Sequence, residues 1–213
     1  MDSLPADVEA LTTALHKDFP PLQRVESVDR HSARLEVLKL LPKGGIGAEL
    51  GVFAGHFSQY LYNVAEPDMF FMVDGWQLVF GDSWPSWGQY NDHGKLTPAM
   101  AREAAHRRAD LMNGKSQVVI SRTVDWLKSL EPNSINWIYS DSGHTYDNTL
   151  KELKEISRVL TEDGIVIGDD CQINSAHPHH SVFRAIRDFC RQEDFEIIYM
   201  DHARQWGIRR IRT

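Results

Sequence analysis

The stretch GAELGVFAGHFS, residues 47–58, joins a short apolar run to a helical pattern through two glycines. The apolar run IGAEL (46–50), which overlaps its start, is continuous rather than alternating, and this is typical of a strand covered on both faces. Gly51 and Gly55 follow, and glycines at this point allow a tight turn and a close approach of backbone amides to a ligand. The stretch therefore predicts a strand, turn and helix with a ligand at the turn.

Similar apolar runs recur along the chain between longer segments with helical spacing. Strands are expected at 46–50, 69–74, 117–121, 135–140 and 164–168, and helices at 27–41, 54–65, 97–112, 123–130, 147–160 and 181–192. This order is typical of a parallel sheet with helices on both sides. Thr97 with Pro98 predicts a helix start, and Gly164 predicts a turn into the next strand. In the helix at 147–160 we place Leu153 on the sheet side and Glu152 on the other face.

The end of the chain departs from this order. The strand-like runs FEIIYM (195–200) and QWGIRRI (205–211) are separated by the short DHAR segment, and so short a connection requires antiparallel pairing. The expected fold is therefore a Rossmann-like, doubly wound α/β domain with a mostly parallel seven-stranded sheet and a C-terminal antiparallel hairpin. Residues 1–26 are expected to form an N-terminal extension to a domain spanning 27–213.

Composition limits the classes of function. The 213 residues carry a formal net charge of −7, whereas binding nucleic acid needs a surplus of Lys and Arg. Cys171 and Cys190 provide no disulfide framework, and the N-terminal MDSLPADVEA has no features of a secretion signal. We expect a cytoplasmic protein with neither membrane nor nucleic acid as partner, and a homo-oligomer stays open.

Asp74 closes the second expected strand. An acidic residue at this distance from a glycine turn accepts hydrogen bonds from ribose hydroxyls. The spacing G-x-G-x-x-G is not met after the first strand, which weakens a nicotinamide dinucleotide as the ligand. The turn and Asp74 together indicate a nucleoside-containing cofactor, and the alternative is that the two glycines only pack and Asp74 only caps a loop.

Three carboxylates follow the fourth and fifth expected strands. Asp141 and His144 come after residues 135–140, while Asp169 and Asp170 come after residues 164–168. Ligands collect at the carboxyl ends of strands in an open α/β sheet, so we expect these groups to converge. Converging carboxylates repel unless they are protonated or share a cation, and their oxygens favour Mg²⁺, Mn²⁺ or Ca²⁺. We expect Mg²⁺, with strand-end capping as the alternative role.

Over roughly residues 27–211 these features resemble class I S-adenosylmethionine-dependent methyltransferases. The resemblance implies that the first turn lies along the methionine part of the cofactor, that Asp74 binds the ribose, and that the end of the third strand borders the adenine. The cofactor residues it implies are Glu49, Gly51, Phe53, Gly55, His56, Phe57, Asp74, Trp76, Ser121, Arg122 and Thr123.

The D-S-G-H-x-Y and G-D-D runs are similar to those of metal-dependent small-molecule O-methyltransferases, a branch that includes sugar enzymes of macrolide and aminocoumarin biosynthesis. The resemblance implies that Asp141, Asp169 and Asp170 hold the metal. Several members have a second Asp as base just after the first, where this chain has Ser142. His144 is then the candidate base, because its unperturbed pKa of ~6.5 allows proton removal near neutral pH.

Two further segments follow expected strands: residues 75–96 come after the strand at 69–74, and a histidine-rich run comes after the strand at 164–168. Residues 75–96 are rich in aromatic side chains and are long for a connection, which favours a lid over the site, although a hydrophobic plug or a subunit contact would read the same way. His177, His179 and His180 are expected to line an acceptor pocket or to be exposed, since no cysteine or H-E-x-x-H context supports zinc.

The sequence thus predicts a Mg²⁺-assisted methyltransferase acting on a hydroxyl of a small molecule, with His144 and Asp141 as catalytic residues. One alternative is an NAD-type oxidoreductase, against which the missing glycine spacing counts. Another is a nucleoside-binding module without catalysis, in which the acidic cluster is only structural.

Overall fold

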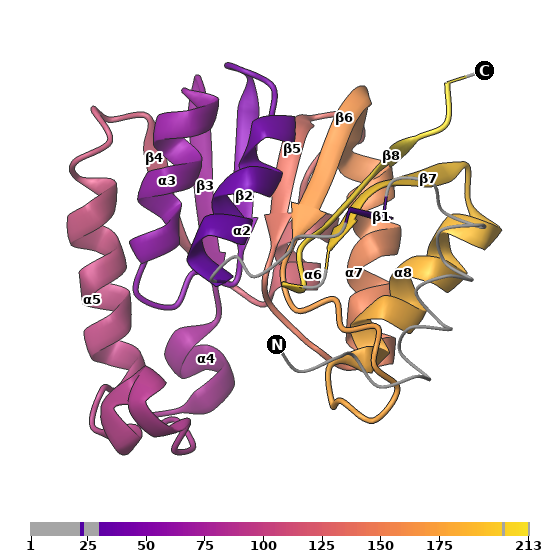
Figure 1. Cartoon of the computed structure of the whole chain (residues 1–213). Helices are drawn as coiled ribbons and strands as arrows, with labels where there is room; N and C mark the ends of the chain where they lie inside the picture. Colours follow the sequence, from indigo (N-terminus) through magenta and orange to yellow (C-terminus); the bar gives the residue numbers. More distant parts are fainter. Residues whose placement is uncertain (1–21, 24–29, 202, 213) are drawn as a thin grey trace.

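The computed structural model describes residues 22–23, 30–201 and 203–212. Its described strands form one eight-stranded sheet in the order β1-β7-β8-β6-β5-β2-β3-β4 (Figure 1). The seven expected strands are β2 (Ile46–Leu50), β3 (Met69–Asp74), β4 (Ser116–Ile120), β5 (Ile135–Ser140), β6 (Leu160–Gly168), β7 (Phe195–Asp201) and β8 (Trp206–Arg210). Strands β2 to β6 pair in parallel, and β8 is antiparallel to both β6 and β7. The predicted Rossmann-like sheet with its terminal hairpin is confirmed.

An additional strand, β1 (Leu22–Gln23), pairs in parallel with β7 at the edge of the sheet. A two-residue strand leaves no periodic pattern, so nothing in the sequence indicates it. The rest of the expected extension at 1–26 lies outside the described residues.

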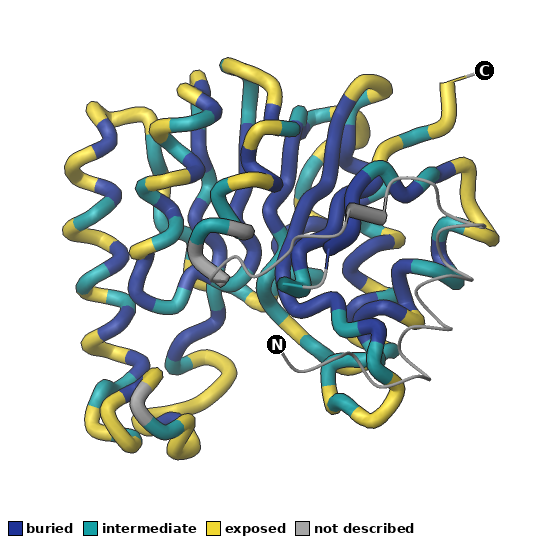
Figure 2. The backbone as a smooth tube through the Cα atoms, viewed as in Figure 1, coloured by how far each residue is buried: buried dark blue, intermediate teal, exposed yellow. Residues whose placement is uncertain are grey.

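Helices cover both faces of the sheet. They are α2 (Arg30–Val37), the short η1 (Leu38–Leu40), α3 (His56–Ala65), α4 (Trp76–Phe80), η2 (Gly88–Gly94), α5 (Pro98–Ala109), α6 (Thr123–Ser129), α7 (Tyr146–Val159) and α8 (His180–Gln192). Side chains of η1, α3 and α5 share one hydrophobic core, and those of α6, α7 and α8 share the other. In β5, Trp137 and Tyr139 belong to the first core and Ile138 to the second, so the strand is buried on both sides (Figure 2). Among the described helices, none has the length and apolarity that a membrane span requires.

Two local predictions have different outcomes. Thr97 caps α5 by accepting a hydrogen bond from the backbone of Met100, with Pro98 in the first turn, as predicted. Gly164, in contrast, is not a left-handed turn residue, because β6 begins at Leu160 directly after α7 and continues through it. A Cβ at Gly164 would lie 2.5 Å from the Leu160 side chain, so close packing is what requires glycine there.

Candidate active site

The glycine turn follows β2 and packs against the backbone that leaves β5. Gly51 has a φ of 90°, and a Cβ on it would lie 2.1 Å from the carbonyl oxygen of Asp141. Gly55 has a φ of 78°, and a Cβ on it would lie 3.2 Å from Cα of Ala105 in α5. Only glycine meets both demands, a left-handed backbone and no side chain. The turn expected to carry the cofactor is therefore directly beside Asp141.

Asp74 fixes this turn to the end of β3. Its Oδ2 accepts hydrogen bonds from the backbone N–H groups of Val52 and Phe53, at 2.9 and 2.8 Å, and its Oδ1 accepts one from Trp76 at 3.0 Å. Burial raises the pKa of Asp74, and these backbone donors act in the opposite direction. A carboxylate has about four acceptor positions; two of them shape the turn that the ribose is expected to meet, and a third holds the start of α4.

Trp76 does not present a face to a cofactor in this structure. Its side chain is fully buried, and its indole N–H donates a hydrogen bond of 2.7 Å to the carbonyl oxygen of Phe53. Trp76, one of the residues that the resemblance implies for the cofactor, thus has its ring packed in the core. A buried indole needs a partner for its N–H, and the carbonyl of the first turn supplies it.

The aromatic segment 75–96 packs onto the same turn. The ring of Phe53 stacks on Trp84 and on Tyr90, with centroids 4.8 and 4.6 Å apart. Asn91 is fully buried and holds the segment together, because its side chain bonds to the backbone of both Trp87 and Pro85. Figure 1 shows α4 and η2, which belong to this segment, at the same end of the sheet as the loop that leads into α8.

Glu49 lies inside the protein rather than at the surface of the turn. It is 2 % exposed and accepts a hydrogen bond from the hydroxyl of Ser58. Burial raises the pKa of Glu49 to about 8, so the carboxyl group is mostly protonated at neutral pH. It supports the turn from beneath as a neutral hydrogen-bonding group.

The other expected cofactor residues have varied surroundings. His56 is exposed at the start of α3, and Phe57 is half-buried against Tyr139, with ring centroids 4.7 Å apart. Ser121 is half-buried, and its backbone N–H donates to the carbonyl of Asp74 at 3.0 Å. Arg122 is exposed. Of this group, Phe57 packs on Tyr139 of β5, and Ser121 is hydrogen-bonded to the end of β3.

Glu152 was placed on the solvent face of its helix, and this is wrong. Its side chain is buried and accepts hydrogen bonds from the hydroxyls of Thr123, Ser140 and Ser142, at 2.5, 2.7 and 2.6 Å. Burial raises the pKa of Glu152, and the three hydroxyl donors oppose that shift. The hydroxyl of Thr123 therefore anchors α6 to α7.

An arginine lies among the carboxylates. Arg34 of α2 pairs with Oδ2 of Asp141 at 2.7 Å and with Oδ2 of Asp169 at 3.1 Å. Its guanidinium also lies 4.1 Å from the centre of the Phe57 ring. Asp141 and Asp169 do come together, as their strand positions indicate, and a protein cation lies between them.

Asp169 is enclosed on all sides. Its side chain has no exposed surface, and its Oδ1 accepts hydrogen bonds of 2.6 Å from the side chain of Gln205 and from the backbone of Asp170. Arg34 takes the other oxygen. Both oxygens of Asp169 thus face protein donors.

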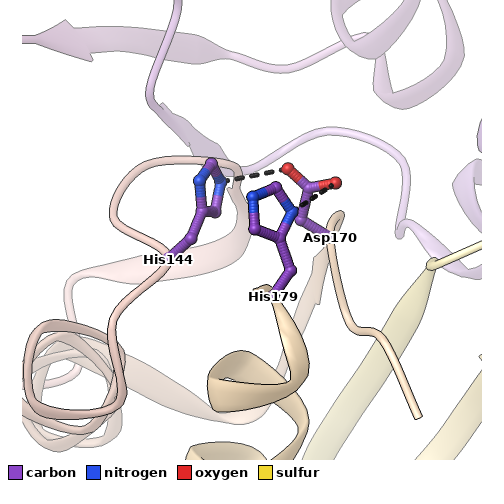
Figure 3. A group of neighbouring side chains, drawn as sticks. All are labelled: His144, Asp170 and His179. Carbon is purple, nitrogen blue, oxygen red and sulfur yellow. Dashed lines mark ion pairs between the residues drawn. The ribbon is translucent and has the colours of Figure 1, made fainter. Parts of the chain in front are cut away.

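Asp170 faces two histidines. Its Oδ2 lies 3.2 Å from Nε2 of His144, and its Oδ1 lies 3.3 Å from Nδ1 of His179 (Figure 3). Nε2 of His144 is also 3.7 Å from Asp141. Burial alone would lower the pKa of His144, but the carboxylates of Asp141 and Asp170 outweigh it and raise the pKa.

Sequence reasoning missed three contributors to this site. Arg34 belongs to a helix more than 100 residues before its partners, and nothing in the helical pattern marks it. His179 stands in a histidine-rich run, but spacing does not show which histidine turns towards Asp170. Glu152 has the periodicity of a surface residue, and the hydroxyls that hold it come from other elements.

Comparison with known proteins supports the fold. A family model described as "Methyltransferase domain" matches residues 48–171, which is more than half of the chain. A search of curated protein sequences finds no significant match. Among solved structures, a protein from Corynebacterium glutamicum is similar with a TM-score of 0.60 and 12 % identity, over 100 % of this chain and 93 % of that one.

Two other similar structures carry named activities. The O-methyltransferase TomG from Streptomyces achromogenes, involved in tomaymycin synthesis and solved with S-adenosylmethionine, has a TM-score of 0.54 and 15 % identity over 97 % of this chain and 88 % of its own. A ribosomal protein L11 methylase from Lactobacillus delbrueckii subsp. bulgaricus has a TM-score of 0.55 and 16 % identity over 87 % and 81 %. At these identities the structures show a shared fold, while the family match shows the class of enzyme. The chain belongs to the methyltransferase-domain family, and it is a class I S-adenosylmethionine-dependent methyltransferase.

Proposed function

We propose that this enzyme transfers the methyl group of S-adenosylmethionine to a hydroxyl group of a small molecule. The observation that carries the proposal is the contact between the glycine turn and Asp141, where Gly51 leaves no room for a side chain. This contact supports the proposal, because Asp141, with His144 and Asp170 close to it, lies beside the turn that we expect to hold the sulfonium.

The chemistry needs little beyond a positioned and deprotonated oxygen. The methyl group of a sulfonium is already electrophilic, so the new O–C bond forms as the S–C bond breaks, provided the oxygen is aligned and has lost its proton. His144, between Asp141 and Asp170, is placed to serve this step. It either takes the proton itself, with the carboxylates stabilising the imidazolium, or would help to hold a cation, which would supply a lower pKa for the hydroxyl when bound.

Magnesium held by Asp141, Asp169 and Asp170 does not fit this arrangement. Arg34 already pairs with both Asp141 and Asp169, and the side chain of Asp169 has no surface left for an ion. A positively charged guanidinium therefore meets the electrostatic need for which Mg²⁺ was expected. The proposed transfer therefore does not use Mg²⁺ bound to these three carboxylates.

Several features favour a small hydroxyl compound over a macromolecule. The net charge of −7 opposes RNA. The aromatic segment 75–96 packs beside the turn through Phe53 and offers apolar surface close to the reacting atoms. TomG, with a similar fold, is an O-methyltransferase. Because the L11 methylase has the same fold, the proposal depends on these site features rather than on the fold.

The test combines binding with turnover. Calorimetric titration of the purified chain with S-adenosylhomocysteine and with NAD should show binding of the first alone. Labelled S-adenosylmethionine should then methylate members of a panel of catechols and sugar diols. Binding of NAD in place of S-adenosylhomocysteine would instead support the oxidoreductase, and cofactor binding without transfer to any hydroxyl would support the non-catalytic module.

A further inference from the structure

We propose that His144, Asp170 and His179 form a binding site for one divalent transition-metal ion such as Zn²⁺, Co²⁺ or Fe²⁺. The three residues come from two connections: His144 lies in the loop after β5, and Asp170 and His179 lie at the two ends of the loop between β6 and α8. Figure 3 shows a ring nitrogen of each histidine directed at one oxygen of the Asp170 carboxylate. The donor set is two imidazoles and one carboxylate.

The separations of the donor atoms suit a metal ion. One ligand atom from each residue can be chosen so that all lie within 4.8 Å of one another. Metal bonds of ~2.1 Å place neighbouring ligand atoms ~3.0–3.4 Å apart in octahedral or tetrahedral geometry. The 3.2 and 3.3 Å separations between the histidine nitrogens and the Asp170 oxygens match that spacing. To bind one ion, the three ligand atoms move from within 4.8 Å of one another to this closer spacing.

The two nitrogens face Asp170 at ion-pair distance without a well-aligned hydrogen bond. Nε2 of His144 and Nδ1 of His179 are buried, and neither makes a hydrogen bond of acceptable geometry with any described residue. Buried polar atoms are nearly always satisfied in proteins, so this pair needs an explanation. A metal ion would accept a lone pair from each neutral imidazole and would also offset the charge of Asp170.

The surroundings hold these ligands in place. Asp170 has a φ of 59°, a conformation uncommon outside glycine and typical of positions that the rest of the fold determines. The hydroxyl of Ser181 donates to the carbonyl of His144 and ties its loop to α8. His177 accepts a hydrogen bond of 3.0 Å from the backbone of His179. The site is thus organised before any ion binds.

The donor set favours a transition metal over Mg²⁺. Imidazole nitrogen suits Zn²⁺, Co²⁺, Ni²⁺ and Fe²⁺, whereas Mg²⁺ prefers oxygen ligands. Asp141 and Asp169 are paired with Arg34, so they do not complete an all-oxygen set. Three protein ligands leave further coordination positions for water or an acceptor hydroxyl. In this assignment His144 is a metal ligand, and it is not the base.

One nearby charge opposes the ion. Nη1 of Arg204 lies 3.5 Å from Oδ1 of Asp170, the same oxygen that faces His179. A guanidinium there competes with a metal for the carboxylate and lowers its affinity. Removing this charge, as in Arg204→Gln, should therefore tighten metal binding. A purely structural histidine pair predicts no such gain.

The experiment measures metal affinity directly, on the purified full chain after chelation and dialysis. Co²⁺ is titrated by its visible absorption, and Zn²⁺ by competition with a chromogenic chelator. One ion should bind per chain, and His144→Ala, His179→Ala and Asp170→Asn should each weaken it by at least about tenfold, since loss of even an outer-shell partner costs about that much. His106→Ala removes an exposed histidine of α5 and should change nothing.

Asp141→Asn distinguishes the proposed site from a metal site at Asp141, Asp169 and Asp170. It should cost less Co²⁺ affinity than any of the three ligand variants, because Asp141 is paired with Arg34. Loss of metal in Asp141→Asn with full binding in His179→Ala would overturn the proposal, as would a wild-type chain that takes up neither ion. Each variant is also titrated with S-adenosylhomocysteine, because intact cofactor binding shows a folded methyltransferase and makes a failed metal site distinguishable from a failed function.

Discussion

The guanidinium of Arg34 lies 2.7 Å from Oδ2 of Asp141, although the two residues are 107 positions apart in the sequence. The same group reaches Asp169, so one cation from α2 holds together the carboxyl ends of β5 and β6. The acidic cluster of this enzyme is therefore partly neutralised by its own fold.

Replacing this cation should destabilise the protein. Arg34→Met leaves two poorly exposed carboxylates without their partner, and we expect the free energy of unfolding to fall by about 3 kcal/mol. Lys39→Met is the control, because Lys39 pairs with Glu36 at the exposed surface, where loss of the pair costs at most about 1 kcal/mol. Urea denaturation of both variants measures the difference, and equal losses would contradict the role given to Arg34.

The contact between Gly51 and Asp141 should be intolerant of a methyl group. Gly51→Ala combines a left-handed φ with a Cβ 2.1 Å from a carbonyl oxygen, so the turn has to move away from β5. Gly114→Ala has a φ of 73° but no atom within 4 Å of its Cβ, and it should cost only about 1–2 kcal/mol of backbone strain. We expect Gly51→Ala, but not Gly114→Ala, to lose affinity for S-adenosylhomocysteine in calorimetry. A Gly51→Ala protein with normal affinity would show that the turn does not position the cofactor.

Glu49 predicts a dependence of stability on pH. Its pKa of about 8 in the folded protein exceeds the ordinary 4.5, so between these values the unfolded chain loses the proton while the folded chain keeps it. Stability should therefore fall as pH rises from 5 towards 8, by at most about 5 kcal/mol, and level off above that range. Glu49→Gln cannot ionise, and its denaturation midpoints should lack this decline. Parallel pH profiles for the two proteins would exclude the shift.

Glu152 should matter far more than its helical position indicates. Glu152→Ala leaves three hydroxyl groups without their acceptor, and hydrogen bonds to charged groups contribute about 1.5–3 kcal/mol each. We expect a loss of about 3 kcal/mol in thermal or chemical unfolding. Lys151→Ala, at an exposed neighbouring position of α7, should stay within about 0.5 kcal/mol of the parent. Equal losses of stability in the two variants would contradict the buried anchoring role given to Glu152.

Local patterns predicted the parts of this fold that depend on local physics. The runs at β2, β3, β5 and β6 are apolar because both faces of each strand are covered, and the short DHAR connection forces the antiparallel hairpin. Gly51 and Gly55 were identifiable because a tight turn at a strand end needs them. The placement of Asp141 beside Asp169 followed from the order of parallel strands.

What the sequence did not predict depends on contacts between distant elements. Arg34 neutralises the cluster from α2, and His179 approaches Asp170 from the start of α8. The indole N–H of Trp76 bonds to the carbonyl of Phe53 in the core, a contact that the sequence does not indicate. No periodicity or motif records these partners, because each depends on how the connections pack at one end of the sheet.

Methyl transfer by wild type and His144→Ala, with S-adenosylhomocysteine affinity measured on the same preparations, tests the proposed function most directly. We predict that the variant binds the cofactor product normally and transfers methyl groups to its hydroxyl acceptor at least about 100-fold more slowly, as expected when a group that activates the nucleophile is removed. Transfer at the wild-type rate by His144→Ala would contradict the account.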